Sequence, residues 1–104
     1  MPPRIKPLRD RKYLNSYRDA SCCACGVRDG TVVGAHIRHG HGGGMGLKPG
    51  DDRTLPLCAK CHAEEGSGET AFWGRTYGLP PLHGVQMAIT VARVRYLKWK
   101  EKQQ

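Results

Sequence analysis

Two pairs of cysteines with the spacing of metal ligands offer the clearest chemistry in this sequence. Two residues separate Cys22 from Cys25, and two separate Cys58 from Cys61. A spacer of this length lets a tight turn direct both thiols of a pair toward one point, so two pairs can close a tetrahedral shell of four sulfurs around Zn²⁺. We therefore predict a structural zinc site formed by these four cysteines.

A redox function is the alternative for a single Cys-x-x-Cys pair. It requires a thioredoxin-like βαβ pattern around the pair, whereas residues 26–50 are glycine-rich and irregular. Cys23 is the fifth cysteine, and only Cys22 gives the two-residue spacing to Cys25. We expect Cys23 to be a small packed side chain.

The composition indicates that a metal contributes to stability. The chain has 104 residues, of which 38% are hydrophobic, with 14 glycines and 7 prolines. One domain of this size and composition has a thin apolar core, which a bound metal can reinforce. Because the four ligands converge only in the folded chain, the free energy of zinc binding adds to the free energy of folding.

The chain is strongly basic, with 17 lysines and arginines against 9 aspartates and glutamates and a net charge of +8. This balance favours nucleic acid as partner, ahead of an anionic membrane, because no segment combines a basic face with exposed bulky apolar residues. A charged surface that serves only solubility is the alternative. The basic residues gather near both ends of the chain: Arg4, Lys6, Arg9, Arg11, Lys12 and Arg18, then Arg93, Arg95, Lys98, Lys100 and Lys102.

The sequence carries neither a run of about 18 apolar residues nor a basic start followed by an apolar stretch. We therefore expect no membrane span and no export signal. An intracellular protein with reduced or metal-bound cysteines is expected.

Hydrophobic patterning and turn residues predict the elements that position the cysteines. They predict an extended N-terminal arm, a short helix over 10–19, strands over 31–37 and 53–57 with a loop over 38–52 between them, and helices over 59–66, 69–77 and 85–101. Phe72 and Trp73 are expected to be buried, and Pro80-Pro81 to break the chain before the last helix. The expected organisation is one domain, in which a basic arm (1–21) precedes a zinc-bound core (22–78) and a basic amphipathic helix (79–104).

The order of strand, loop, short strand and helix beside a cysteine pair resembles the HNH endonucleases, or ββα-metal nucleases. The likeness is greatest to small phage and prophage members, whose motifs correspond here to Ala35 to Arg38, Gly43 to Pro49 and Leu55 to His62, followed by Gly68-Glu69 and Phe72-Trp73. The match covers about residues 22–73. It implies a small α+β fold with a zinc-stapled ββα-metal core, similar to a treble clef, in the cytoplasm of a bacterial host.

The resemblance also implies a metal-dependent DNA endonuclease or nickase that hydrolyses phosphodiester bonds. Hydrolysis needs a base to deprotonate water and a cation to stabilise the charge that builds on the phosphate. The resemblance places the general base at His36 and a ligand of the catalytic cation at His62. A histidine with a pKa near 6.5 is available as the neutral base. The catalytic cation would be Mg²⁺, Mn²⁺ or Ni²⁺, separate from the structural zinc.

One residue departs from the family pattern. Many members carry Asp or His immediately before the base, as a ligand of the catalytic metal, whereas this chain has Ala35. Either His36 itself binds the metal and another group is the base, or the cation has fewer protein ligands and more water, which Mg²⁺ tolerates.

For further ligands of the catalytic cation, neighbouring residues of the same type are alternatives. The middle position of the motif falls near Asp52, with Asp51 as its competitor. Where family members often carry another histidine in the helix, this chain has Gly66. Glu65 or Glu64 could substitute, because they lie about one helical turn on from His62.

The loop and its flanks supply the remaining candidates. His39 and His41 are other possible metal donors. Arg38, Lys48 and Arg53 are expected to bind phosphates of the nucleic acid, because guanidinium and ammonium groups suit phosphate oxygens.

Two functions of other classes compete with the nuclease. A non-catalytic zinc module that binds nucleic acid is the first, because the ligand position at Ala35 is missing. A zinc-stabilised protein adaptor is the second, although it accounts for neither the charge nor His36. The expected partner is DNA as a duplex, while DNA against RNA and the oligomeric state stay open.

Overall fold

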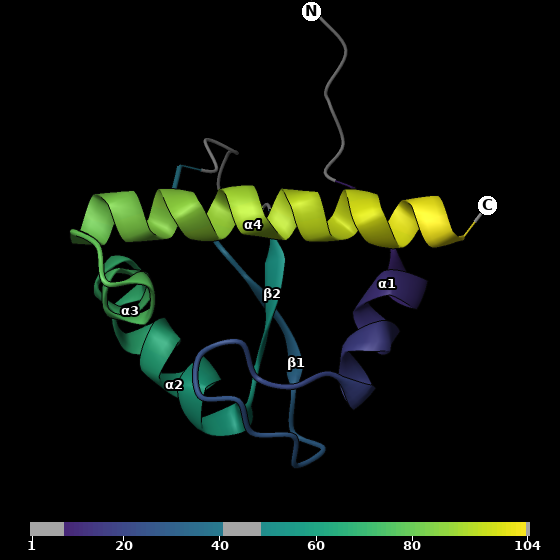
Figure 1. Ribbon diagram of the computed structural model, residues 1–104, viewed down its shortest axis with the longest axis horizontal. Coiled ribbons are helices and arrows are strands. Elements are labelled where there is room, and N and C mark those ends of the chain that lie inside the picture. The colour runs from purple at the N-terminus through teal and green to yellow at the C-terminus, as the bar shows by residue number, and fades with distance from the viewer. Residues whose placement is uncertain (1–7, 41–48, 104) are drawn as a thin grey trace, which may run out of the picture.

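The computed structural model describes residues 8–40 and 49–103 of the chain. The elements follow in the order α1 (Arg11–Asn15), the 3₁₀ helix η1 (Ser16–Asp19), β1 (Val33–His36), β2 (Thr54–Leu57), α2 (Ala59–Ser67), α3 (Glu69–Tyr77) and α4 (Pro81–Lys102) (Figure 1). The predicted small α+β class is thereby confirmed. The predicted helices and strands all occur, with ends shifted by a few residues.

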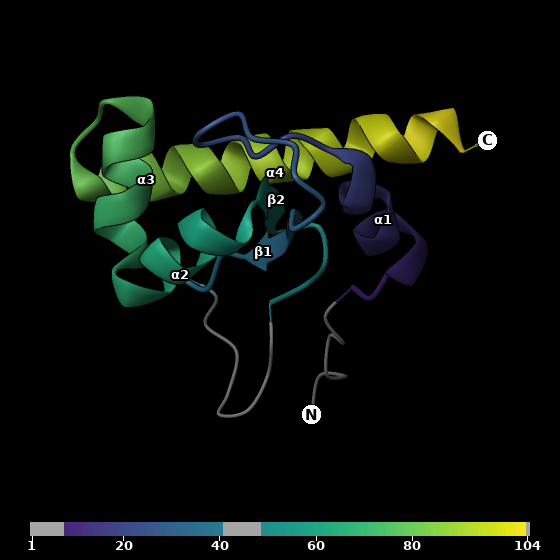
Figure 2. The same ribbon diagram turned by 90° about the horizontal axis from the view of Figure 1, so that it is seen from below.

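The two strands form an antiparallel pair in which Val33 faces Leu57 and His36 faces Thr54. Successive residues of a strand point to opposite faces of the sheet. Ala35 is fully buried in the main core, so His36 projects from the other face. The hairpin lies between α1 on one side and α2 and α3 on the other, and α4 crosses over all of them (Figures 1 and 2).

The long helix α4 begins four residues earlier than its predicted start at residue 85. Pro81 occupies the first helical position, where the missing N–H needs no partner and the fixed φ suits a helix. As predicted, the proline pair interrupts the chain between α3, which ends at Tyr77, and the last helix, and its second proline also starts that helix.

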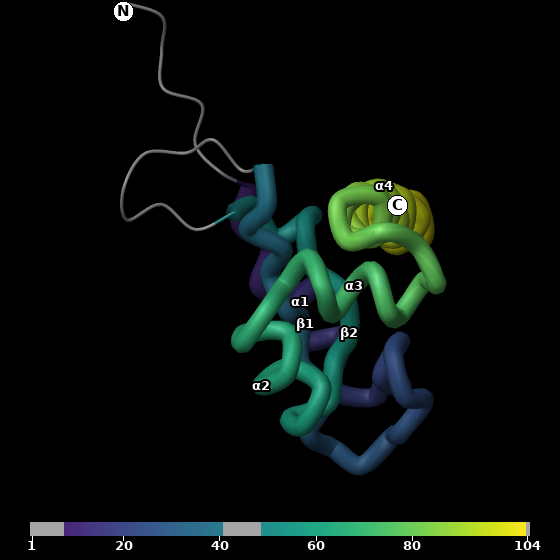
Figure 3. The backbone as a smooth tube through the Cα atoms, turned by 90° about the vertical axis from the view of Figure 1, so that its left-hand side faces the viewer, coloured from purple at the N-terminus to yellow at the C-terminus, as the bar shows by residue number. Residues whose placement is uncertain are grey.

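Helices α3 and α4 approach each other closely. A Cβ atom on Gly84 would lie 2.4 Å from the Cα of Gly74, so both helices depend on glycine at this crossing. Viewed from the side in Figure 3, α3 lies between α4 and α2. The buried Trp73 of α3 belongs to the same core cluster as Leu55 and Leu57 of β2 and Val85 and Ala88 of α4. Phe72 and Trp73 are both buried, as predicted.

A second, aromatic cluster holds the N-terminal segment in place. Tyr13 and Tyr17 are buried against Tyr96 of α4, and Trp99 packs beside them. The rings of Tyr13 and Tyr96 meet edge to face with centroids 4.8 Å apart. The described residues from Leu8 onward are therefore part of the folded body. None of the described helices is both long enough and apolar enough to cross a membrane.

Candidate functional site

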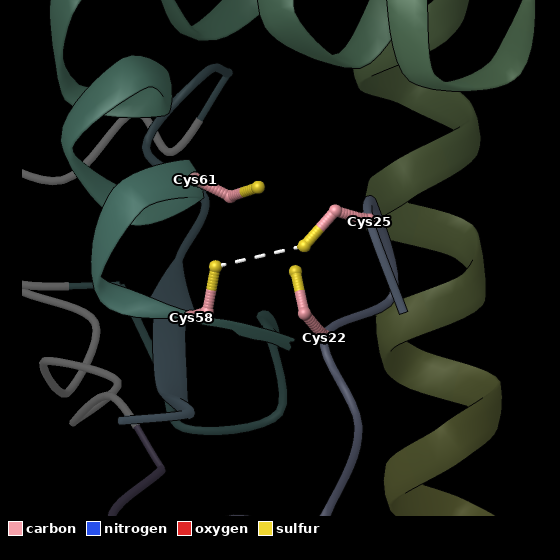
Figure 4. Close-up of side chains that lie close together, drawn as sticks. All are labelled: Cys22, Cys25, Cys58 and Cys61. Carbon is pink, nitrogen blue, oxygen red and sulfur yellow. Dashed lines mark hydrogen bonds between the residues drawn. The ribbon is translucent and has the colours of Figure 1, made fainter. Parts of the chain in front are cut away.

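Four cysteines converge beside α2 and form a candidate metal centre. Cys58 precedes the first residue of α2 and Cys61 lies in its first turn, while Cys22 and Cys25 come from a tight turn after η1. Gly26 closes that turn with a φ of +82°, a conformation that side chains rarely adopt. Figure 4 shows the four sulfurs directed toward one point.

The distances within this cluster fit a tetrahedral metal ion. The four Sγ atoms all lie within 4.8 Å of one another, and those of Cys25 and Cys58 are 3.7 Å apart. A tetrahedral site with bonds of about 2.3 Å places its sulfurs about 3.8 Å from one another. The predicted grouping is confirmed, and these thiols could hold one metal ion.

The thiols differ in how readily they ionise. Burial opposes ionisation of Cys22, but hydrogen bonds from the backbone at Cys58, Cys25 and Ala24 outweigh it and lower the pKa of Cys22 to about 6. Burial and the neighbouring thiols raise the pKa of Cys61. Since metals bind the thiolate, a cation at this point relieves the repulsion that several thiolates would otherwise have.

Cys23 corrects one expectation, because it is exposed and does not pack into the core. Its backbone N–H donates to the carbonyl of Pro56 at 2.9 Å, which fixes the turn to β2. A turn that brings Cys22 and Cys25 together leaves the residue between them on the outer side.

A cavity of about 420 Å³ gathers several of the predicted catalytic residues. It lies where β1, α2 and the start of α3 meet. Its lining consists of Gly34, His36, Arg38, Pro49, His62, Glu65, Gly66 and Glu69. Two histidines, two carboxylates and one arginine therefore share a hollow of a size that admits a small polar group.

His36 is held by a buried carboxylate within this region. Its Nε2 lies 2.9 Å from Oδ1 of Asp51, whose side chain is only 4% exposed. The other oxygen of Asp51 accepts the backbone N–H of Asp10 at 2.7 Å, and Nη1 of Arg9 lies 3.7 Å from Oδ1. Of the two neighbouring aspartates considered, the structure brings Asp51 to the histidine, while Asp52 is half-buried beside it.

In α2 the structure also distinguishes between two neighbouring carboxylates, Glu64 and Glu65. Glu65 is buried, lines the cavity with His62 and accepts a hydrogen bond from Nε1 of Trp73 at 3.1 Å. Burial raises the pKa of Glu65 to about 7. Glu64 is exposed and lines a separate hollow beside Cys61.

The chain around Glu69 shapes the rim of the cavity. Its two carboxylate oxygens accept the backbone N–H groups of Arg38 and His39 at 2.8 and 2.7 Å. The Arg53 guanidinium donates to the carbonyls of Ile37 and His39, so it holds this loop from the other side. The Arg38 side chain is exposed at the rim.

Two predicted site residues, His41 and Lys48, lie outside the described residues. His39 is half-buried and does not line the cavity. Within residues 8–40 and 49–103, the four cysteines are the group of three or more potential ligands that is compact enough for a metal. His36, His62 and Glu65 share the cavity without forming such a group.

Sequence reasoning missed two residues that organise this region. The side chain of Asp10 accepts the backbone N–H of Tyr13 and so caps α1, and its own backbone N–H donates to Asp51. An aspartate just before a predicted helix is a helix-capping pattern, and this pattern could have identified Asp10 from the sequence. Glu69 is the second residue, and Gly68-Glu69 is part of the family resemblance, but the resemblance assigned no role to its carboxylate.

Comparison with known families assigns the chain to a family whose function is unknown. Residues 1–93 match the family described as "Protein of unknown function (DUF968)", and the protein belongs to that family. No curated protein and no solved structure matches the chain.

Proposed function

We propose that this protein is a metal-dependent DNA endonuclease or nickase of the HNH, ββα-metal type, with zinc bound by the four cysteines. The observation that carries the proposal is the cavity that His36, hydrogen bonded to buried Asp51, lines together with His62 and Glu65. The sequence resemblance had assigned a base and a cation ligand to His36 and His62, and both line this cavity.

In the proposed mechanism, His36 takes the proton of the attacking water. When Nε2–H donates to Asp51, the neutral ring carries its lone pair on Nδ1, which is then the basic atom. The carboxylate of Asp51 stabilises the imidazolium that forms. Because Asp51 is itself held by Asp10, the ring keeps one orientation.

His62 and Glu65 would hold the catalytic cation together with water. That cation would supply charge stabilisation at the phosphate and the leaving oxygen. The Glu65 carboxylate and water are ligands that suit Mg²⁺ or Mn²⁺, and the His62 imidazole is a ligand that suits Ni²⁺. Arg38 at the rim would bind a phosphate of duplex DNA.

The position of Ala35 supports the alternative in which the catalytic cation has fewer protein ligands and more water. Ala35 is fully buried and packs in the core behind the strand. An aspartate at this position would be buried among apolar side chains, so it would not reach the cavity.

A nucleic-acid-binding zinc module without catalysis is the second candidate. The observation that favours it is the absence, among the described residues, of a compact three-ligand group in the cavity. Both candidates predict binding of DNA, and only the nuclease predicts strand cleavage.

Plasmid nicking distinguishes them. Purified protein with supercoiled plasmid should produce nicked or linear DNA with Mg²⁺, Mn²⁺ or Ni²⁺ and none with EDTA. His36→Ala should reduce the rate by about 10² to 10⁴, with zinc content and DNA affinity retained. Wild-type protein that leaves the plasmid intact with every cation would refute the nuclease and favour the binding module.

A further inference from the structure

A second cavity, of about 510 Å³, lies between the N-terminal helices and the C-terminal half of α4. Figure 2 shows α1 beside that half of α4. The residues that line this groove are Tyr13 and Ser16 from the N-terminal side and Thr90, Val91, Val94, Arg95, Lys98, Trp99 and Lys102 from α4. We call it the α1–α4 groove.

The charge of the groove is of one sign. Arg95, Lys98 and Lys102 are exposed in its wall, and no carboxylate is among the described residues that line it. These cations lie at spacings of three and four residues, so they follow one side of α4 over about 10 Å. The charge of such a row of cations is more complementary to a row of anions, as in a polyanion, than to a single anion.

The floor of the groove is apolar and aromatic. Trp99 is half-buried against Tyr13, with ring centroids 5.1 Å apart, and Val94 is 45% exposed. A duplex presents mainly phosphates to a protein surface, whereas a single strand also exposes the faces of its bases. Apolar and aromatic side chains beside cations are therefore the combination that single-stranded nucleic acid recognises.

We propose that the α1–α4 groove binds a single-stranded segment of nucleic acid, with phosphates on Arg95, Lys98 and Lys102 and bases against Trp99 and Val94. The groove is distinct from the cavity at His36, with which it shares no lining residue. The inference deepens the proposed function, on which it rests for its biological use: the substrate would be DNA with an unpaired segment near the point of cleavage.

The structure connects the groove to the cavity through hydrogen bonds. The hydroxyl of Tyr96, beside Trp99 on α4, donates to Oδ2 of Asp10 at 3.0 Å. Asp10 donates its backbone N–H to Asp51, and Asp51 meets His36. A strand bound in the groove would therefore be held at a constant position relative to the proposed base.

Binding of a labelled oligonucleotide to the full chain tests this proposal, measured by fluorescence anisotropy in the His36→Ala background so that cleavage plays no part. The test variant is Lys98→Gln with Lys102→Gln. The matched control is Arg93→Gln with Lys100→Gln, which removes the same charge from the same helix. By the helical period, Arg93 and Lys100 lie on the other side of the buried stripe of α4, and they do not line the groove.

We expect the groove variant to bind a single strand at least about tenfold more weakly, and the salt slope of log K to fall by about 1.4 because two phosphate contacts are lost. The control variant should lose less than about threefold in affinity for the single strand. For a duplex of equal length, the affinities of the two variants should differ less. Equal losses in both variants, equal discrimination with duplex, or equally effective competition by polyglutamate would overturn the proposal. Groove-dependent binding without plasmid nicking by the wild type would refute the nuclease alone, and nicking without groove-dependent binding would refute the groove alone.

Discussion

The Nε2 atom of His36 lies 2.9 Å from Oδ1 of Asp51, although 15 positions separate the two residues along the chain. His36 ends β1, and Asp51 stands just before β2, so the hairpin pairing brings them to the same end of the sheet. A buried carboxylate costs free energy unless it is hydrogen bonded, and Asp51 has both oxygens engaged. The pair therefore couples the stability of the hairpin to the orientation of the proposed base.

Asp51→Asn should slow plasmid nicking at least about tenfold, because a neutral amide stabilises the imidazolium less well than a carboxylate. The measurement is the nicking rate at saturating Mn²⁺, with zinc content as a check of folding. Asp52→Asn is the matched control, and we expect a rate close to wild type. If the Asp52 variant were slower and the Asp51 variant unaffected, the prediction would be wrong, and the role would belong to Asp52.

Cys58→Ser should abolish binding of the structural metal and leave the protein unfolded or insoluble, since the metal contributes to the free energy of folding. Metal analysis should find about one zinc per wild-type chain, and a strong chelator should unfold it. Cys23→Ser, at an exposed cysteine outside the cluster, should keep both the metal and the fold. A metal-free Cys58→Ser protein with wild-type stability would contradict this role of the site.

Glu65→Gln should raise the Mg²⁺ concentration needed for half-maximal nicking by about tenfold or more, because a neutral amide is a weaker ligand than a carboxylate. The hydrogen bond from Trp73 can be kept by the amide oxygen, so the fold should survive. Glu64→Gln provides the control, since that side chain lines a different hollow. The prediction fails if both variants require the same cation concentration as the wild type.

Gly84→Ala should destabilise the protein by about 1–3 kcal/mol, because its Cβ would meet backbone atoms of Gly74 at 2.4 Å. Denaturant unfolding measures the change in the free energy of unfolding. Gly66→Ala is the comparison within α2, where a Cβ has no neighbour within 4 Å. The Gly66 variant should be more stable than wild type by about 0.5–1 kcal/mol. A Gly84 variant with unchanged stability would show that the α3–α4 contact can widen freely.

The features that the sequence by itself determined are local in the chain. The two-residue spacers of the cysteine pairs restrict where their thiols can point, and the apolar period of α4 marks its buried face through Val85, Ala88 and Ala92. These patterns predicted the cysteine cluster, both strands and the helices. The family resemblance added the roles of His36 and His62, which remain proposals.

Tertiary structure alone decided between residues that are neighbours in sequence. Asp51 and Asp52 carry the same group, as do Glu64 and Glu65. Only the packing of the hairpin against α1 and of α2 against Trp73 determines that Asp51 meets His36 and that Glu65 lines the cavity. The hydrogen bond from Tyr96 to Asp10 joins residues 86 positions apart. Such contacts depend on how whole elements dock, and docking is governed by burial and shape, which no short-range spacing encodes.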